Sequence, residues 1–146
     1  MHIKRLTRRT LTLSMGALGL ALFVGYQVAQ AQRKIPTEHQ GVKVVSLGVL
    51  PESSLAAQIG LRGYVMQLRE ITLAPGGRIG RHDHFRRPGL VATLSGTWTE
   101  GRPSGEKEYP ASKKQAILED QDTEHWFWND GAEPVTVTVC DLVPAK

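Results

Sequence analysis

Three histidines stand at spacings that suit a metal ion. His82 and His84 are separated by one residue, and alternate residues of a β-strand point to the same face. Their two imidazoles can therefore coordinate one metal ion, and His125 offers a third nitrogen ligand from a later segment. Three neutral imidazoles suit Fe, Mn, Zn, Ni or Cu, and a catalytic site would keep an open position. On spacing alone, the alternative is that His82 and His84 are surface residues among the arginines around them.

Five residues near these histidines are candidates for binding a substrate. Arg81, Arg86 and Arg87 flank the first pair, and a guanidinium fits a carboxylate in a two-pronged hydrogen bond. The alternative for all three is a solvated, charged turn. Thr93 is placed by strand alternation where it could point inward, and Phe127 shares a face with His125. For Phe127 the alternative is packing in the core.

The elements that must position these residues are short strands. Segments rich in Val, Ile, Thr and aromatic residues alternate with Gly, Pro and Asn-Asp-Gly turns, and this pattern is typical of a β-sandwich or barrel. The residues from 74 to 77, Ala-Pro-Gly-Gly, are expected to close a strand with a turn. Ser53 and Ser54 precede an apolar patch that predicts one helical turn or an arm. The predicted strands are 42–50, 64–73, 78–84, 90–98, 107–109, 115–118, 124–129 and 135–143.

Two stretches of the chain resemble the paired motifs of the cupin family. The first is Gly76, five residues, His82-x-His84 and then Gly96; the second is Asp120-x-Asp122-x-x-His125-x-x-x-Asn129. The resemblance covers residues 61–146. It implies an all-β double-stranded β-helix, the jelly-roll barrel, with a divalent transition-metal ion inside near one mouth. It also implies that His82, His84 and His125 are the three histidine ligands.

The first motif differs from that of the family because it lacks the usual glutamate ligand. Members carry a Glu ligand four or five residues after the second histidine, and this chain has Pro88 and Gly89 there. The departure implies a three-histidine site. Glu100 or Glu108 is considered as a fourth ligand from elsewhere. The second motif has Asp120 and Asp122 where Pro and Gly are usual, and Asp also supports tight turns.

Residues 1–31 have the features of an export signal. A basic stretch that ends at Arg9 precedes an apolar run from Leu11, and Ala29-Gln30-Ala31 offers a cleavage site. Arg8-Arg9 resembles a twin-arginine signal. The alternative is an uncleaved membrane anchor, because the run is near the lower limit for a span. Both place the domain outside the cytoplasm, periplasmic or secreted in a bacterium.

Residues 32–60 are interpreted as a linker and N-terminal arm, with His39 solvated, and residues 61–146 as the cupin domain.

Charge and cysteine content exclude several function classes. The net charge of +4 equals the four basic residues of the leader, so the rest of the chain is neutral and lacks the basic surface of a nucleic-acid-binding domain. A single Cys excludes an internal disulfide framework. The three-histidine site that the resemblance implies, with no carboxylate and with apolar residues around it, leads us to expect a metal-dependent oxidoreductase, dioxygenase-like, that acts on a small organic molecule. A non-catalytic metal or small-molecule binding module is one alternative, and a metal-dependent isomerase, lyase or hydrolase is another. Trp126 and Trp128 face away from the histidines and are a candidate homodimer interface.

Overall fold

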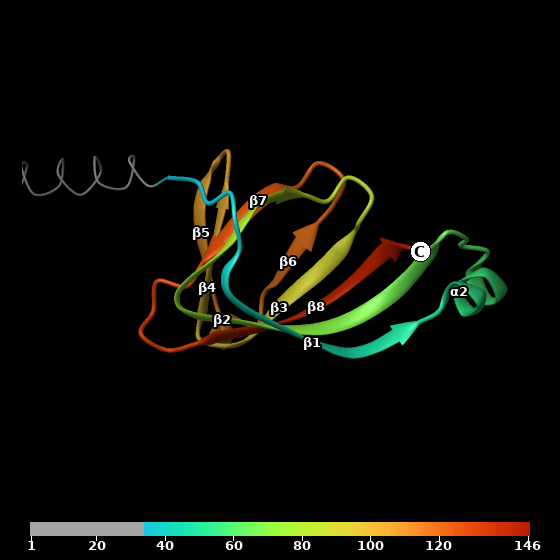
Figure 1. Ribbon diagram of the computed structural model, residues 1–146, viewed down its shortest axis with the longest axis horizontal. Helices are drawn as coiled ribbons and strands as arrows, with labels where there is room; N and C mark the ends of the chain where they lie inside the picture. The colour runs from blue at the N-terminus through green and yellow to red at the C-terminus, as the bar shows by residue number, and fades with distance from the viewer. Residues whose placement is uncertain (1–33) are drawn as a thin grey trace, which may run out of the picture. The chain divides into compact units, whose positions relative to one another are not determined.

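The structure, a computed structural model, describes residues 34–146, and Ile35–Lys146 form one compact unit (Figure 1). The predicted signal segment, residues 1–31, lies outside the described residues. Within residues 34–146, no helix combines the length and the apolar character needed to cross a membrane. The elements are β1 (Gln40–Leu50), α2 (Glu52–Ile59), β2 (Tyr64–Asp83), β3 (Gly89–Ser95), β4 (Thr97–Arg102), β5 (Gly105–Pro110), the 3-10 helix η1 (Ala111–Lys113), β6 (Ala116–Glu119), β7 (Glu124–Trp128) and β8 (Val135–Pro144).

The strands form one antiparallel sheet that curls into a nearly closed barrel (Figure 1). The strand order is β5-β4-β7-β2-β8-β3-β6, and β1 pairs with β2. Neighbours far apart in sequence, such as β2 and β8, lie side by side. The predicted all-β barrel is confirmed, and its hollow interior is where the inward faces of the strands meet.

The predicted turn at residues 74–77 is wrong, because β2 runs through it. Its first half, Tyr64 to Leu73, pairs with β8, and its second half, from Arg78, pairs with β7. Gly76 has φ +69°, and a Cβ on Gly77 would lie 2.7 Å from Leu73 Cδ1. The Pro-Gly-Gly stretch therefore bends one long strand from one partner to the next. This bend carries the histidine-bearing end of β2 over to β7.

Two other boundaries differ from those expected. The predicted strand 90–98 is divided into β3 and β4 at Gly96, whose φ of +74° only glycine adopts readily. Helix α2 has eight residues rather than one turn. It ends at Gly60, which is left-handed and donates its N–H to the carbonyls of Ala56 and Leu55.

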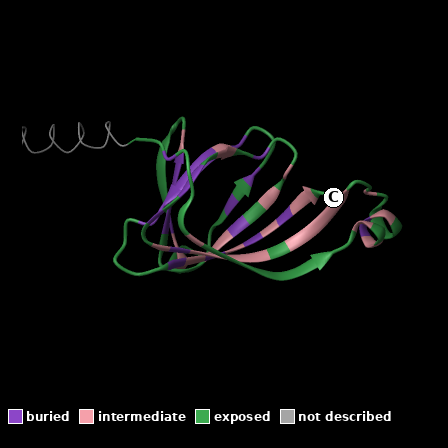
Figure 2. Ribbon diagram, viewed as in Figure 1, coloured by how far each residue is buried: buried purple, intermediate pink, exposed green. Residues whose placement is uncertain are grey.

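The core lies between the inward faces of the strands. It is built from apolar and aromatic residues of β2 to β8, with Leu73, Trp98 and Val137 among the most buried. Figure 2 shows buried residues gathered on β4 and β7, whereas β1 is exposed along most of its length. Along β8, Val135, Val137 and Val139 alternate inward, and the next inward residue is Asp141, also buried. Alternation thus brings a carboxylate into the barrel.

Candidate metal centre

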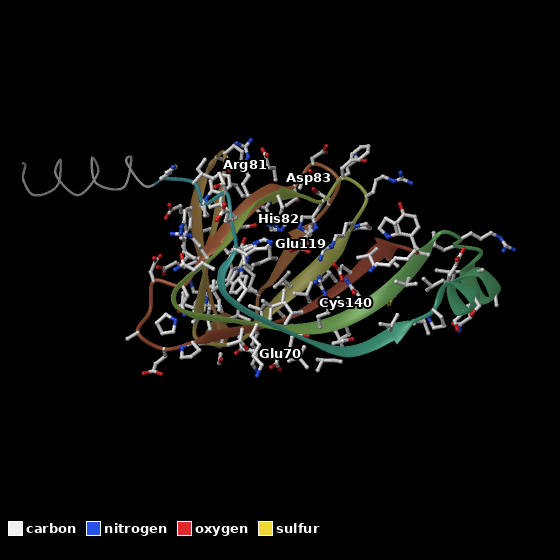
Figure 3. The ribbon with its side chains drawn as sticks, viewed as in Figure 1. Glu70, Arg81, His82, Asp83, Glu119 and Cys140 are labelled. Carbon is white, nitrogen blue, oxygen red and sulfur yellow. The ribbon has the colours of Figure 1, made fainter. Side chains whose placement is uncertain are left out.

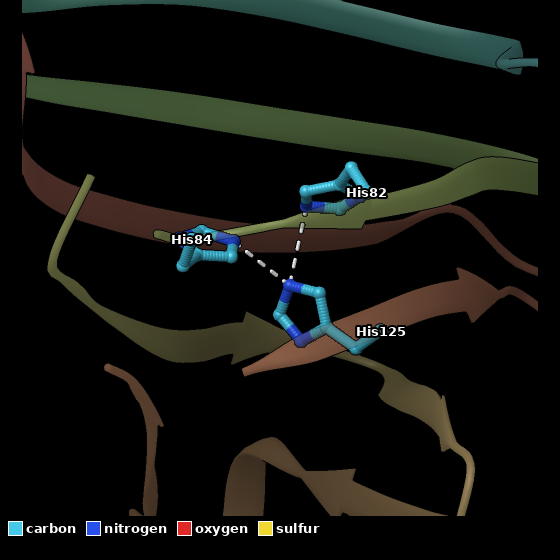
Figure 4. A group of neighbouring side chains, drawn as sticks. All are labelled: His82, His84 and His125. Carbon is cyan, nitrogen blue, oxygen red and sulfur yellow. Dashed lines mark hydrogen bonds between the residues drawn. The ribbon is translucent and has the colours of Figure 1, made fainter. Parts of the chain in front are cut away.

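The three predicted ligands meet inside the barrel. His82 stands near the end of β2, His84 is the first residue after that strand, and His125 lies opposite His82 in the β2–β7 ladder. The Nε2 atom of His125 is 3.2 Å from His82 Nε2 and 3.0 Å from His84 Nε2 (Figure 4). All three side chains offer a ligand atom within 4.8 Å of the others. Sequence spacing and strand pairing together therefore bring the three rings to one point.

The other ring nitrogens of the first two histidines are held by backbone carbonyls. His82 Nδ1 is 2.9 Å from the carbonyl oxygen of Gly80, and His84 Nδ1 is 2.8 Å from that of Arg87. A carbonyl only accepts, so each Nδ1 carries the proton and donates it. In a neutral ring, Nε2 then presents a lone pair. Local hydrogen bonds within the strand end and the following turn therefore aim both Nε2 atoms inward.

His125 is held by a carboxylate instead. Its Nδ1 lies 2.7 Å from Glu100 Oε1 on β4. Glu100 also accepts hydrogen bonds from Arg102 and from the hydroxyl of Tyr109, at 2.8 Å and 3.1 Å. Burial raises the pKa of Glu100, but the hydrogen bonds from His125 and Arg102 outweigh it and leave the pKa lowered. Glu100 is therefore an anion behind His125, on the side away from the point where the Nε2 atoms meet.

The protonation states of the three histidines fit a metal ion. Burial lowers the pKa of His82, of His84 and of His125, so near neutral pH the rings are neutral. Three lone pairs then face one another at close range, an arrangement that repels unless a cation lies among them. Protein metal sites orient histidine ligands in this way, with the second ring nitrogen donating to a carbonyl or carboxylate. The three histidines can therefore hold a transition-metal ion.

A buried carboxyl that the sequence analysis did not single out lies beside the histidines. Glu119, the last residue of β6, has Oε1 3.6 Å from His125 Nε2 and Oε2 3.4 Å from His84 Nδ1. Burial raises its pKa to about 7, the nearby charge of Asp141 adds to the effect, and two arginines oppose it. In Figure 3, Glu119 lies next to His82 inside the barrel, and both line one cavity. No local motif marks Glu119, because only the sheet register brings it here.

The cavity beside the histidines has a volume of about 240 Å³. Apolar side chains of β1, β2, β3, β4, β7 and β8 line most of it, and its polar lining includes Arg69 and Arg87. Both guanidiniums bind the same oxygen of Asp141, Arg69 through Nη2 at 2.8 Å and Arg87 through Nε at 2.7 Å. The interior is therefore a small space with mainly apolar walls, where two arginines and the acidic residues Asp83 and Glu119 supply the charged lining.

The three predicted substrate-binding arginines are separated by the structure. Arg87 lines the cavity. Arg81 is exposed and forms a two-pronged ion pair with Glu124, and its label lies toward the outside of the barrel in Figure 3. Arg86 is exposed in the turn after β2 and does not line the cavity. Of the three, only Arg87 is placed to contact a molecule beside the histidines, and Arg69 takes a place that the sequence did not indicate.

The other two predicted contact residues also differ from each other. Phe127 lines the cavity, with its ring centroid 4.5 Å from that of His125 and 4.7 Å from that of Trp98. It packs in the apolar core and also lines the cavity beside the histidines, and its contact with a substrate stays a prediction. Thr93 donates its hydroxyl to the carbonyl of Tyr109 at 2.9 Å and does not line the cavity. Its polar group is thus engaged in joining strands.

Two further expectations concern His39 and the two tryptophans of β7, and the dimer itself stays a prediction. His39 is exposed, as predicted, but its Nδ1 accepts a hydrogen bond from the Gly80 N–H at 3.0 Å, and it lines the cavity. The segment before β1 therefore contributes to the site. Trp126 and Trp128 point away from the metal centre as predicted, with their rings in edge contact. Trp126 is 5% exposed and Trp128 is 7% exposed, so these rings offer little surface to a second chain.

Comparisons with known proteins give a fold. No family model matches the chain, and no curated protein matches it. The cupin domain of an XRE-family transcriptional regulator from Enterobacter cloacae is 20% identical, with a TM-score of 0.52 over 73% of this chain and 100% of that one. A predicted oxalate decarboxylase from Thermotoga maritima is 15% identical, with a TM-score of 0.54 over 80% and 96%.

A sugar phosphate isomerase of the cupin superfamily from Silicibacter pomeroyi is 14% identical, with a TM-score of 0.52 over 76% of each chain. At such identities a likeness shows the fold and leaves activity open. The barrel, the order of its strands and the placing of the three histidines agree with what the two sequence motifs imply. The described part of this chain therefore has the cupin fold.

Proposed function

We propose that this chain is an exported, metal-dependent enzyme, dioxygenase-like, that acts on a small organic molecule. One observation carries the metal site: three Nε2 lone pairs converge while an acceptor holds each opposite Nδ1 proton. His82, His84 and His125 would hold the ion. When bound, a transition-metal ion supplies Lewis-acid chemistry and, for iron or manganese, redox chemistry as well.

The cavity supports a small organic substrate. Its volume of about 240 Å³ is below the ~300–1,000 Å³ typical of pockets for drug-sized ligands. Its apolar lining would exclude water, and Arg87 stands where it can bind a carboxylate or other anionic group. The same wall holds Arg69, which Asp141 keeps in position. These features favour a molecule with a small apolar body and one negative group.

Metal content is the first test. The chain is expressed from its full-length sequence, so that any export signal acts, and bound metals are measured by elemental mass spectrometry. We expect near-stoichiometric metal in the wild type and its loss in His82→Ala, with Arg81→Ala as a control outside the cavity. Equal metal content in the wild type and in His82→Ala would overturn the assignment of the site.

Oxygen dependence is the second test, because it separates the reactions. Oxygen uptake is screened against small aromatic and aliphatic carboxylates, with and without oxygen, using the metal-loaded wild type and His125→Ala. Uptake that needs both substrate and His125 supports the dioxygenase-like activity. Turnover that persists without oxygen would replace it by an isomerase, lyase or hydrolase, and tight binding without turnover would indicate a binding module.

Export is proposed from residues 1–31 and needs its own measurement. Cell fractionation together with the mass of the mature N-terminus distinguishes the alternatives. We expect a chain that begins at Gln32 in the periplasm or medium. A full-length chain in the membrane fraction would indicate an anchor.

A further inference from the structure

A glycine makes room for a carboxylate beside the histidines. Gly89 occupies a position where cupin sequences carry a Glu, and in this sheet it pairs directly with Glu119 across β3 and β6. A Cβ on Gly89 would lie 2.6 Å from Glu119 Oε2, a distance that real side chains do not tolerate. The carboxyl of Glu119 therefore fills the space into which a side chain at position 89 would project.

The carboxyl of Glu119 is buried, and one of its oxygens has no hydrogen-bond partner among the described residues. Its side chain is 4% exposed, and its Oε2 has no hydrogen-bond partner among the described residues. The neighbouring arginines, Arg69 and Arg87, both bond to Asp141 instead. A buried oxygen without a partner is costly. The other oxygen of the same carboxyl, Oε1, lies 3.6 Å from His125 Nε2, so a metal ion at the histidine Nε2 atoms would lie within reach of this carboxyl and offset that cost.

We propose that Glu119 is the carboxylate ligand of this metal centre, supplied by β6 in place of the missing side chain at position 89. The inference rests on the proposed three-histidine site. It gives the ion three neutral ligands and one anion, and carboxylate oxygens are accepted by the same transition metals as imidazoles. The two carboxylates considered from sequence are placed otherwise: Glu100 is bound behind His125, and Glu108 is exposed on β5.

Cobalt binding to the chain expressed from its full-length sequence tests the proposal. Metal is removed with a chelator, Co²⁺ is added back, and both its dissociation constant and its visible spectrum, which reports the ligands, are recorded. The variants are Glu119→Gln, which keeps the shape, and Glu119→Ala. Glu108→Ala is the matched control, a Glu to Ala change at an exposed site. Circular dichroism confirms that each variant is folded.

We expect both Glu119 variants to bind Co²⁺ at least about 10- to 100-fold more weakly, since even partners of metal ligands have effects of that size. Their Co²⁺ spectra should also differ from the wild type, whereas Glu108→Ala should match it. A double variant that places the carboxylate at position 89 instead of 119 gives a more direct comparison with Glu119→Ala. In Gly89→Glu with Glu119→Ala, the blocking oxygen is gone and Asp141 Cβ at 3.0 Å becomes the nearest atom to the new Cβ. We expect this double variant to regain affinity over Glu119→Ala.

Unchanged affinity and spectrum in Glu119→Gln and Glu119→Ala would overturn the proposal while leaving the three-histidine site intact. Weaker binding with an unchanged Co²⁺ spectrum would also overturn it, because Glu119 would then only position a histidine. Failure of the wild type to bind Co²⁺ would overturn the proposed function and this inference together.

Discussion

Replacing Glu119 by Gln in the metal-free protein should stabilise it at alkaline pH and not at acid pH. Burial and the charge of Asp141 raise the pKa of Glu119 from 4.5 to about 7 in the folded state. Between these pH values the folded chain holds a proton that the unfolded chain has lost. The free energy of unfolding therefore falls as pH rises through this window, and the favourable contribution is complete only below pH 4.5.

The size of the effect follows from the shift. At about 1.4 kcal/mol for each pH unit between 4.5 and about 7, the buried carboxyl destabilises the wild type by about 3 kcal/mol above pH 7. Gln has nearly the same shape and does not titrate. The difference in unfolding free energy between Glu119→Gln and wild type should thus grow by about 3 kcal/mol from pH 4.5 to pH 8.

Urea unfolding in the presence of a chelator measures the difference. Trp98, Trp126 and Trp128 are all buried, so tryptophan fluorescence reports loss of the barrel. With a slope of about 1–3 kcal/mol per molar urea, the midpoint of the variant should exceed that of the wild type by about 1 M or more at pH 8. A midpoint difference that is the same at pH 4.5 and pH 8 would show that Glu119 is not held in a buried, metal-free pocket, and the reasoning would fail.

Two further predictions concern contacts around the site. Gly101→Ala should lower the free energy of unfolding by about 1–3 kcal/mol or more, because the new Cβ would lie 2.0 Å from Trp126 Nε1. Gly48→Ala is the control, since no atom lies within 4 Å of its Cβ, and its urea midpoint should be close to that of the wild type. Equal midpoints for the two variants would contradict the packing around Gly101. Glu100→Ala should weaken Co²⁺ binding about 10- to 100-fold because His125 loses the acceptor of its Nδ1 proton; chelator competition measures this, and unchanged affinity would show that the pair does not orient the ring.

The fold can be predicted well from the sequence because most strands of the barrel show the two-residue periodicity of a half-buried strand. Alternating Val and Thr along β8 and the histidine spacing at the end of β2 are both consequences of a period of two. The long bend in β2 was missed, since Pro75-Gly76-Gly77 has the composition of a turn. Nothing local distinguishes a turn that reverses the chain from a bend that carries one strand between two partners, β8 and β7.

Part of the site followed from sequence in the same way. The three histidines are found because strand alternation and motif spacing fix their faces. Arg69 and Asp141 were missed because they lie far apart in the chain and meet only through the pairing of β2 with β8. Arg87 was named with two neighbours, but Arg81 lies within β2 and pairs with Glu124, whereas Arg87 lies in the turn after β2 and lines the cavity.

Glu119 could be located only by combining a sequence observation with the sheet pairing. Pro88 and Gly89 stand at the positions where the motif that this chain resembles carries a Glu, and Gly89 places no side chain in the interior of the barrel. A carboxylate at the inward position of whichever strand pairs with Gly89 can then enter the same space, and β6 supplies one at the directly opposed residue. The glycine on one strand and the carboxylate on the next thus share one space, which is the basis of the proposed ligand. A search for a displaced ligand should therefore follow the sheet pairing of the vacant position rather than the nearest acidic residues in sequence.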